Sequence, residues 1–268
     1  MKTGITTMRL PTSVLPATML AAGLVFQTPV LADNHGGNWE PSGEDIAYQV
    51  GGEAFEGYLS PADDESRGTV LVIHDWDGID DYERQRADMI AAMGFDAFAV
   101  DLYGEGNRPQ ETGAKKAETE RLYQDRERMQ SLTRAGLEFA RDQGVAEETV
   151  VMGYCFGGAV VLEAARNGLV DQAAGFATFH GGLSTPEGQS WSDPGAPILI
   201  AHGGADSMIS MNDVATLSGE LEDVGATYTI EVYSGAPHAF TVFGTGAYQE
   251  RADKQSWTAF TELLDQVF

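Results

Sequence analysis

The sequence is poor in cysteine and in basic residues. Its 268 residues include one cysteine, Cys155, so no disulfide can form within the chain. Lysine and arginine number 16 against 41 aspartates and glutamates, which gives a formal net charge of −25. Such a surface repels polyanions and lacks the basic patch that nucleic-acid binding requires. We therefore expect no nucleic-acid partner, and we interpret the acidic composition as a solvated surface.

Long hydrophobic runs and metal-binding patterns are also missing. No stretch after the N-terminal region approaches the roughly eighteen apolar residues of a membrane-spanning helix, so we expect no membrane span. No two histidines have helix spacing with a carboxylate, and Gly104-Glu-Gly106 lacks the third glycine of a phosphate loop. We therefore expect neither a metal nor another cofactor.

The first 32 residues differ in composition from the rest. Lys2 and Arg9 are their only charged side chains, and an apolar stretch follows from Val14 to Phe26. An aliphatic residue and an alanine then precede a cleavage point after Ala32, which is typical of an export signal. We predict a signal peptide over 1–32, a flexible mature N-terminus over 33–43, and a periplasmic or secreted protein. The alternative is an uncleaved, disordered tail.

Residues 44–268 alternate short apolar runs with longer amphipathic stretches. Two strands, 45–50 and 54–60, meet at Gly51-Gly52 and are predicted to form an antiparallel edge hairpin. The pattern then predicts six further strands, over 69–74, 96–100, 149–152, 173–179, 197–201 and 227–233. Helices are predicted over 82–93, 114–143, 156–167, 212–224 and 248–267. An irregular rim or lid loop is predicted over 181–195. Short, apolar, β-branched runs are typical of parallel strands buried on both faces. We predict one α/β domain over 44–268, with a mostly parallel, doubly wound sheet and helices on both faces.

A glycine-rich turn, Gly153-Tyr-Cys155-Phe-Gly157-Gly158, links a predicted buried strand to a predicted helix. Cys155 takes the place of the serine in a G-x-S-x-G elbow, where larger neighbours would collide with the adjacent strand and helix. The helix that begins at Phe156 directs its N–H groups at the sulfur, which favours thiolate over thiol. We predict that Cys155 is a catalytic nucleophile. The alternative is a small buried side chain without chemistry.

The base and the acid are expected after the nucleophile, each beyond a strand, in the order cysteine, aspartate, histidine. Asp206 follows the predicted strand 197–201, and His238 follows the predicted strand 227–233. The aspartate would accept the Nδ1 hydrogen of the histidine and stabilise the imidazolium that forms when the histidine takes the thiol proton. We predict a catalytic triad of Cys155, Asp206 and His238, with Asp206 as a mere turn residue the alternative. His180 and His202 are predicted to satisfy backbone groups at loop starts.

The motif His74-Asp75-Trp76 ends the first predicted parallel strand. A second donor to the negative oxygen of a tetrahedral intermediate is normally supplied from this position. We therefore predict an oxyanion hole formed by the backbone N–H groups of Trp76 and Phe156.

Five motifs together carry a family resemblance. They are Val72-Ile-His-Asp-Trp76, Ala99-Val-Asp-Leu-Tyr103-Gly, Gly153-Tyr-Cys-Phe-Gly-Gly158, His202-Gly-Gly-Ala-Asp206 and Pro237-His-Ala-Phe240. In this order they resemble the dienelactone hydrolase family of α/β-hydrolases over residues 44–268. The resemblance implies an α/β-hydrolase fold, a Cys–His–Asp triad and hydrolysis of an ester or lactone, as in a carboxymethylenebutenolidase.

The resemblance also implies a role for Asp75. A carboxylate at this site, usually glutamate, is thought to help deprotonate the thiol when substrate displaces it, so that the thiolate forms on demand. Asp75 is one methylene shorter, and the alternative is a solvated loop carboxylate.

Substrate contacts are implied in the same way. Well-studied dienelactone hydrolases hold the substrate carboxylate with two arginines, one after the Asp-Leu-Tyr block and one after the histidine. Here Arg108 is a candidate for the first, and no basic residue follows His238 until Arg251. We predict Arg108, Tyr103 and Phe240 as substrate contacts and expect a less charged ester or lactone at least as readily as a dicarboxylate-like one.

The sequence therefore predicts a monomeric ester or lactone hydrolase. Cys155 would attack the carbonyl, form an acyl-enzyme and release it to water activated by His238. The competing hypothesis is a non-catalytic binding protein of the periplasm with the same fold. The intact set of Cys155, Asp206 and His238 argues against it, because a binding protein would not need all three.

Overall fold

The computed structural model describes Met1 and residues 39–268. Apart from Met1, the predicted signal peptide lies outside the described residues, as does the first part of the predicted flexible segment 33–43. The described part of that segment is anchored to the domain. The indole Nε1 of Trp39 donates to Asp88 at 3.1 Å, and the backbone amides of Ser42 and Gly43 donate to the same carboxylate. Trp39, Ser42 and Gly43 are therefore hydrogen-bonded to the domain through Asp88.

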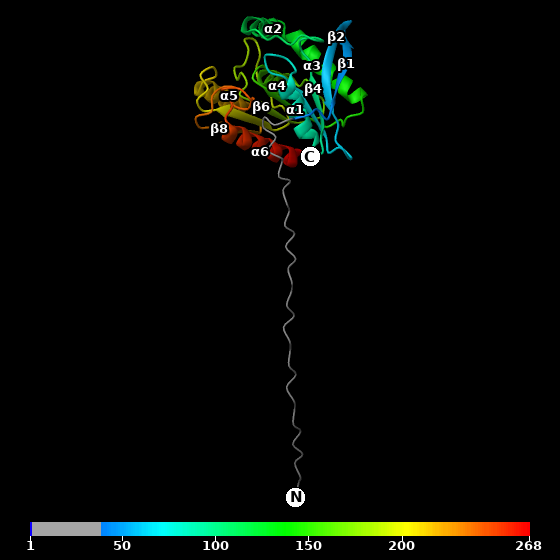
Figure 1. Cartoon of the computed structure of the whole chain (residues 1–268). Coiled ribbons are helices and arrows are strands. Elements are labelled where there is room, and N and C mark those ends of the chain that lie inside the picture. Colours follow the sequence, from blue (N-terminus) through cyan, green and yellow to red (C-terminus); the bar gives the residue numbers. More distant parts are fainter. Residues whose placement is uncertain (2–38) are drawn as a thin grey trace. The chain divides into compact units, whose positions relative to one another are not determined.

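An eight-stranded sheet forms the centre of the domain (Figure 1). Its strands are β1 (Glu44–Val50), β2 (Glu53–Ser60), β3 (Thr69–Ile73), β4 (Asp96–Val100), β5 (Thr149–Tyr154), β6 (Ala173–Phe179), β7 (Ile198–Gly203) and β8 (Tyr228–Tyr233). They lie in the order β1-β2-β4-β3-β5-β6-β7-β8. β1–β2 and β2–β4 pair antiparallel, and the remaining pairs are parallel. The predicted edge hairpin and mostly parallel sheet are confirmed.

Helices cover both faces of the sheet, as predicted (Figure 1). They are α1 (Asp81–Ala91), α2 (Thr112–Gln124), α3 (Arg126–Asp142), α4 (Phe156–Asn167), α5 (Met211–Val224) and α6 (Glu250–Val267). Side chains alternate along each strand, so Leu71 and Ile73 of β3 pack with α3, α4 and α5, whereas Val70 and Val72 pack with α1 and α6. The apolar runs of β3, β4, β5 and β7 are therefore buried on both faces, whereas β8 at the sheet edge is partly exposed.

The single helix predicted over 114–143 is instead two helices. Asp125 separates α2 from α3 with φ −119° and ψ 74°, and its side chain accepts a hydrogen bond from the Arg128 amide at 3.0 Å. An aspartate that caps a new helix in this way interrupts the preceding one.

The segment 181–195 contains no helix or strand, as predicted. Its side chains Leu183 and Trp191 are nevertheless buried, so it packs against the domain. Among the described residues, no helix combines the length and apolar character needed to cross a bilayer.

Candidate active site

Cys155 lies in a strained turn between β5 and α4. Its φ is 49° and its ψ −108°, in a region that side chains other than glycine rarely adopt. Close packing explains the neighbouring glycines. A Cβ on Gly157 would lie 2.3 Å from the carbonyl oxygen of Ile73, and one on Gly153 would lie 2.5 Å from the carbonyl of Gly157. The predicted elbow geometry is confirmed.

The three predicted triad side chains form one chain of hydrogen bonds. The Sγ of Cys155 lies 3.1 Å from Nε2 of His238, and Nδ1 of His238 lies 2.8 Å from Oδ2 of Asp206. The other oxygen of Asp206 accepts from the backbone amides of Met208 and Ile209 at 2.7 and 2.9 Å. The Asp206 carboxylate is thereby fixed, and it holds the imidazole in the tautomer that leaves Nε2 free to accept the thiol proton.

The environment of Cys155 favours the neutral thiol. Burial raises the pKa of Cys155 to about 12, and the nearby carboxyl of Asp75 acts in the same direction. The backbone N–H of Phe156 opposes both by donating to the sulfur. The helix N-terminus therefore acts in the predicted direction, but burial and the Asp75 carboxyl outweigh it.

The carboxyl of Asp75 is buried rather than solvated. Burial raises the pKa of Asp75 well above its usual range, and a hydrogen bond to Asp77 and the charge of Glu83 add to this effect. Its Oδ1 accepts from the Asp77 amide at 3.0 Å, and no described residue links it by a hydrogen bond to the thiol of Cys155. Its interaction with the thiol is therefore one of charge.

The loop that carries Asp75 is held from several sides. His74 donates from Nδ1 to the carbonyl of Asp75 at 2.7 Å and accepts from the Leu102 amide at 3.2 Å. Glu83 of α1 accepts from the Asp75 amide at 3.2 Å. Burial lowers the pKa of His74, so the ring is neutral and can make both bonds.

Two further residues contact this loop, and one of them, Lys115, was not predicted from the sequence. Lys115 of α2 binds Oδ2 of Asp77 through its Nζ at 2.6 Å, and the same ammonium lies 5.3 Å from the ring centre of Trp76. Tyr103 donates to the carbonyl of Trp76 at 3.2 Å. The amide of Trp76 has no acceptor within the described part of the chain, so it is free to donate to another group.

Arg108 has a structural role in place of the predicted contact with substrate. Its Nε donates to the carbonyl of Ile79 at 2.7 Å, its Nη2 to the carbonyl of Glu56 at 3.1 Å, and its Nη1 to Asp101 at 3.4 Å. The guanidinium is thus committed to neighbouring loops and strands.

Phe240 and Tyr103 are likewise packed inside the domain. Phe240 is 0% exposed and contacts the rings of His180 and Tyr233, so it cannot touch a bound substrate in this conformation. Tyr103 is also buried, and its hydroxyl is bound to the carbonyl of Trp76. The predicted contacts of both residues with substrate are therefore corrected.

The ring of His202 binds no backbone group among the described residues, contrary to prediction, whereas the ring of His180 binds a side chain. Nε2 of His180 lies 2.8 Å from Oγ1 of Thr241, and its ring packs against that of His238 at 5.2 Å. Both nitrogens of His202 are buried without a partner among the described residues. Burial lowers the pKa of both histidines, so they are neutral.

A cavity of about 290 Å³ lies alongside α4. It is lined by Tyr123, Arg126, Ala159, Glu163, Arg166, Gly182, Ser184 and Pro186. Ala159 is one helical turn from Cys155 and donates its amide to the Cys155 carbonyl at 3.3 Å. The ring of Tyr123 contacts that of Phe156 with centroids 5.4 Å apart. None of the three triad residues lines this cavity, and Ala159 is its lining residue nearest to Cys155 along α4.

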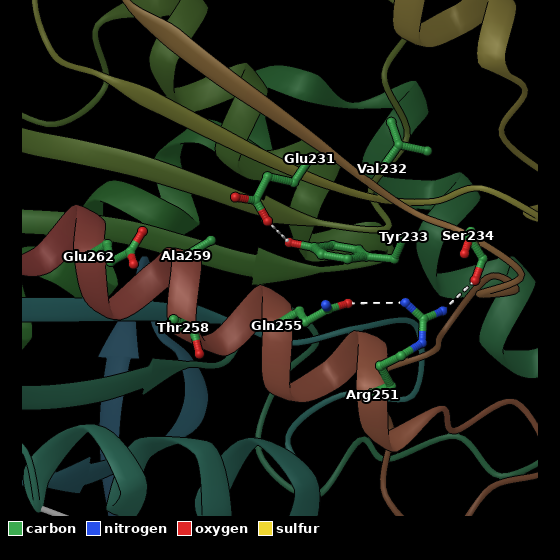
Figure 2. Close-up of a pocket in the computed structure, with 9 residues that line it drawn as sticks. All are labelled: Glu231, Val232, Tyr233, Ser234, Arg251, Gln255, Thr258, Ala259 and Glu262. Carbon is green, nitrogen blue, oxygen red and sulfur yellow. Dashed lines mark hydrogen bonds between the residues drawn. The ribbon is translucent and has the colours of Figure 1, made fainter. Parts of the chain in front are cut away.

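A larger groove of about 540 Å³ lies between β8 and α6 (Figure 2). Arg251 spans it, donating to the carbonyl of Ser234 at 2.5 Å and to Gln255 at 3.1 Å. None of the three triad residues lines this groove. We therefore do not assign the reaction to it. No cluster of three or more potential metal ligands occurs in the described part of the chain.

Comparison with known proteins identifies the family of the chain. The model of the dienelactone hydrolase family matches residues 55–268. A Salmonella typhimurium protein named "Putative carboxymethylenebutenolidase" is 27% identical over 267 residues, covering 96% of each chain. A Bradyrhizobium protein named "Probable 2-oxo-3-(5-oxofuran-2-ylidene)propanoate lactonase" is 26% identical over 70% of this chain and 79% of its own. The solved structure of a dienelactone hydrolase-like promiscuous phosphotriesterase from metagenomic libraries is 25% identical, with a TM-score of 0.77 over 85% of this chain and 98% of that one. The chain belongs to the dienelactone hydrolase family of α/β-hydrolases.

Proposed function

We propose that the protein hydrolyses a small carboxylic ester or lactone, with Cys155 as nucleophile, His238 as base and Asp206 as the residue that orients the base. The observation that carries this proposal is the unbroken hydrogen-bond chain from the Cys155 sulfur through His238 to Asp206. The carboxymethylenebutenolidase and lactonase names of two relatives support the same class of substrate.

The first half-reaction transfers the acyl group to sulfur. Because Cys155 rests as a thiol, His238 takes the Sγ proton as the sulfur attacks the carbonyl carbon. The carbonyl oxygen becomes negative and accepts hydrogen bonds from the amides of Trp76 and Phe156. When the tetrahedral intermediate collapses, the carbon–oxygen bond to the leaving group breaks. His238 gives its proton to the departing oxygen, and a thioester remains on Cys155.

The second half-reaction releases the acid. His238 takes a proton from water, which attacks the thioester carbonyl, and the carbon–sulfur bond breaks. The proton then returns from His238 to the sulfur, so the enzyme regains its resting thiol. Asp206 stabilises the imidazolium in both halves through the 2.8 Å bond to Nδ1.

The cavity alongside α4 is the proposed place for the acyl part of the substrate. Its volume of about 290 Å³ is near the lower end for ligand pockets, which favours a small ester or lactone. Arg108 is committed to its own loops, so the arginine that the family resemblance implies for a substrate carboxylate is not free at this position.

The proposal is tested by assaying purified protein on p-nitrophenyl acetate and a panel of enol-lactones beside Cys155→Ala. We expect the substitution to reduce kcat by at least about a thousandfold, since the nucleophile is lost. Mass spectrometry of the wild-type protein quenched during turnover should detect one acyl group on Cys155. Circular dichroism of the variant checks that its fold is intact.

Two outcomes would contradict the proposal. Equal hydrolysis by a folded Cys155→Ala protein would remove Cys155 from the reaction. A wild-type protein that binds these esters without hydrolysing any of them would instead favour the binding protein of the same fold.

A further inference from the structure

Lys115 reaches the loop 74–77 from outside it. It lies in the first turns of α2, 38 residues from Asp77, and its Nζ binds Oδ2 of Asp77 at 2.6 Å. The two side chains are only 16% and 19% exposed, so water screens this pair less than a surface pair. The contact therefore connects α2 to the loop that follows β3.

The same ammonium also contacts Trp76. It lies 5.3 Å from the centre of the indole ring, within the range of a cation–π interaction. Tyr103 fixes the other side of this residue by donating to the Trp76 carbonyl. Lys115 thus contacts two consecutive residues, one of which supplies a proposed oxyanion-hole amide.

Asp77 in turn contacts Asp75. The amide of Asp77 donates to Oδ1 of Asp75 at 3.0 Å. Among charged groups, the Asp75 carboxyl has the largest effect on the pKa of Cys155. Burial opposes ionisation of Asp77, but hydrogen bonds from Asp75 and Lys115 outweigh it and lower the pKa of Asp77. Negative charge is therefore concentrated on Asp77, next to the ammonium and away from Asp75.

The charged and titratable groups around this pair come from several elements. Glu83 and the capping residue Asp80 belong to α1, Tyr103 follows β4, and Cys155 precedes α4. The charges of Asp75 and Asp77 raise the pKa of Cys155, as does that of Asp206. Among the described groups that act on this loop, Lys115 is the cation in direct contact with one of its carboxylates.

We propose that Lys115 is a positioning residue for hydrolysis: by holding Asp77 and Trp76 together, it fixes the oxyanion-hole amide and the neighbouring Asp75 carboxyl. This inference rests on the proposed function of Cys155 and Trp76. Lys115 does not touch the reacting atoms. Lys115 acts on the reacting atoms through the Trp76 amide, and through the negative charge of Asp77 that its ammonium compensates.

The test compares Lys115→Met with Lys116→Met. The two lysines are adjacent on α2 and lose the same charge, but Lys116 is exposed and has no part in the loop contacts. We expect Lys115→Met to reduce kcat on p-nitrophenyl acetate about tenfold with little change in KM, because oxyanion stabilisation acts in the transition state. Lys116→Met should keep the wild-type kcat.

A second readout follows the thiol itself. The pH dependence of Cys155 alkylation by iodoacetamide should move to higher pH in Lys115→Met, because the charge of Asp77 is no longer compensated beside the sulfur. A loss of kcat caused only by a disturbed structure would not move the alkylation profile to higher pH. Lys115→Arg, which keeps both the ion pair and the contact with the indole, should restore most of the kcat and the wild-type alkylation profile.

Asp77→Asn removes the other charge of the ion pair with little change in side-chain size. If Lys115 acts through Asp77, the losses in kcat of Lys115→Met and Asp77→Asn should be clearly non-additive in the double variant. The proposal is overturned if Lys115→Met matches Lys116→Met in both kcat and alkylation profile, or if the double variant is additive. An active Cys155→Ala protein would instead overturn the proposed function itself, so the two failures are distinguishable.

Discussion

At the scale of single residues, opposing interactions act on the thiol of Cys155. The N–H of Phe156 donates to its sulfur, which favours the thiolate, while burial and the Asp75 carboxyl favour the thiol. Burial and the carboxyl have the larger effect, so the pKa of Cys155 is raised from 9.0 to about 12. A thiol of this kind resists alkylation and oxidation in the resting protein, since the thiolate is the reactive form.

The alkylation of Cys155 tests this balance, and the single cysteine of the chain makes the measurement unambiguous. We expect iodoacetamide to react at pH 8 roughly a thousandfold more slowly than with an unperturbed thiol, because three pKa units separate the two. The rate should keep rising above pH 9. Asp77→Asn should move the profile to lower pH, since it removes a negative charge that raises the pKa of Cys155.

The unfolded protein in urea provides the control for this experiment, because it exposes the same thiol without its surroundings. An alkylation profile with its inflection below pH 7 would contradict the prediction. It would show that Cys155 and His238 rest as a thiolate–imidazolium pair.

The hydrogen-bonded set of Cys155, Asp206 and His238 could be predicted from the sequence because each member follows a strand in a fixed order along the chain. Cys155 follows β5, Asp206 follows β7 and His238 follows β8. The pair of Lys115 and Asp77 could not, since no local pattern indicates where α2 lies relative to the loop after β3. Phe240 was misassigned because proximity to His238 in sequence does not reveal the direction of its side chain, which is toward the core.

At the scale of elements, the start of α4 is packed directly onto the end of β3. A Cβ on Gly157 would lie 2.3 Å from the carbonyl oxygen of Ile73 and 2.5 Å from that of His74. Both obstacles are backbone atoms, which cannot move aside as a flexible side chain can. The turn that carries Cys155 and the loop that carries Trp76 are therefore held in one relative position.

Gly157→Ala is expected to disturb both segments at once. We expect a loss of at least about 3 kcal/mol in the free energy of unfolding, because the added methyl group overpacks the contact. Activity should fall about a hundredfold in the fraction that folds, because displacements of about 1 Å in a catalytic site have this effect. Urea denaturation and ester hydrolysis measure the two quantities.

Gly219→Ala is the matched control for this substitution. Gly219 is an exposed position inside α5, and a Cβ there would meet no atom within 4 Å. The alanine should stabilise the helix by up to about 1 kcal/mol and leave the activity unchanged. If both variants behaved alike, the close contact between α4 and β3 would have no energetic importance.

The alternation of strands and helices was predictable for a physical reason, namely that strands buried on both faces must be apolar along their whole length. The division between α2 and α3 was not, because no glycine or proline marks it. Asp125 lies between charged and polar residues, and its capping of α3 depends on a backbone conformation that its sequence neighbours do not reveal.

At the scale of the whole molecule, a buried ion pair connects the two helices on one face of the sheet. Arg86 of α1 contacts Asp253 of α6, and both side chains are 1% exposed. Arg86 also donates to the carbonyl of Thr241 at 3.0 Å, in the segment that follows His238. Rings of Phe243 and Trp257 lie 4.2 and 4.9 Å from the guanidinium.

Asp253→Ala should destabilise the protein strongly. It leaves the Arg86 charge buried without its partner, which typically lowers the free energy of unfolding by about 3–5 kcal/mol. Asp265→Ala serves as the control, because Asp265 forms an exposed pair with Arg67 that should contribute at most about 1 kcal/mol. Equal denaturation midpoints for the two variants would show that the buried pair is dispensable.

Export is a property of the whole chain, and we propose that residues 1–32 direct it. Expression of the full chain in a Gram-negative host should place the protein in the periplasmic fraction, with a mature N-terminus at Asp33. A protein that begins at residue 33 should stay in the cytoplasm. Recovery of the full chain from the cytoplasm with Met1 or Lys2 as its first residue would contradict the proposal.

The separation of the triad from the cavity wall has an evolutionary consequence. Cys155, Asp206 and His238 follow strands of the central sheet, whereas Tyr123, Arg126 and Ser184 of the wall belong to α2, α3 and the segment 181–195. Substitutions of Tyr123, Arg126 or Ser184 change the wall without altering the strands that carry the three proposed reacting groups. Descendants of such a protein can therefore acquire new substrates while inheriting the same reaction.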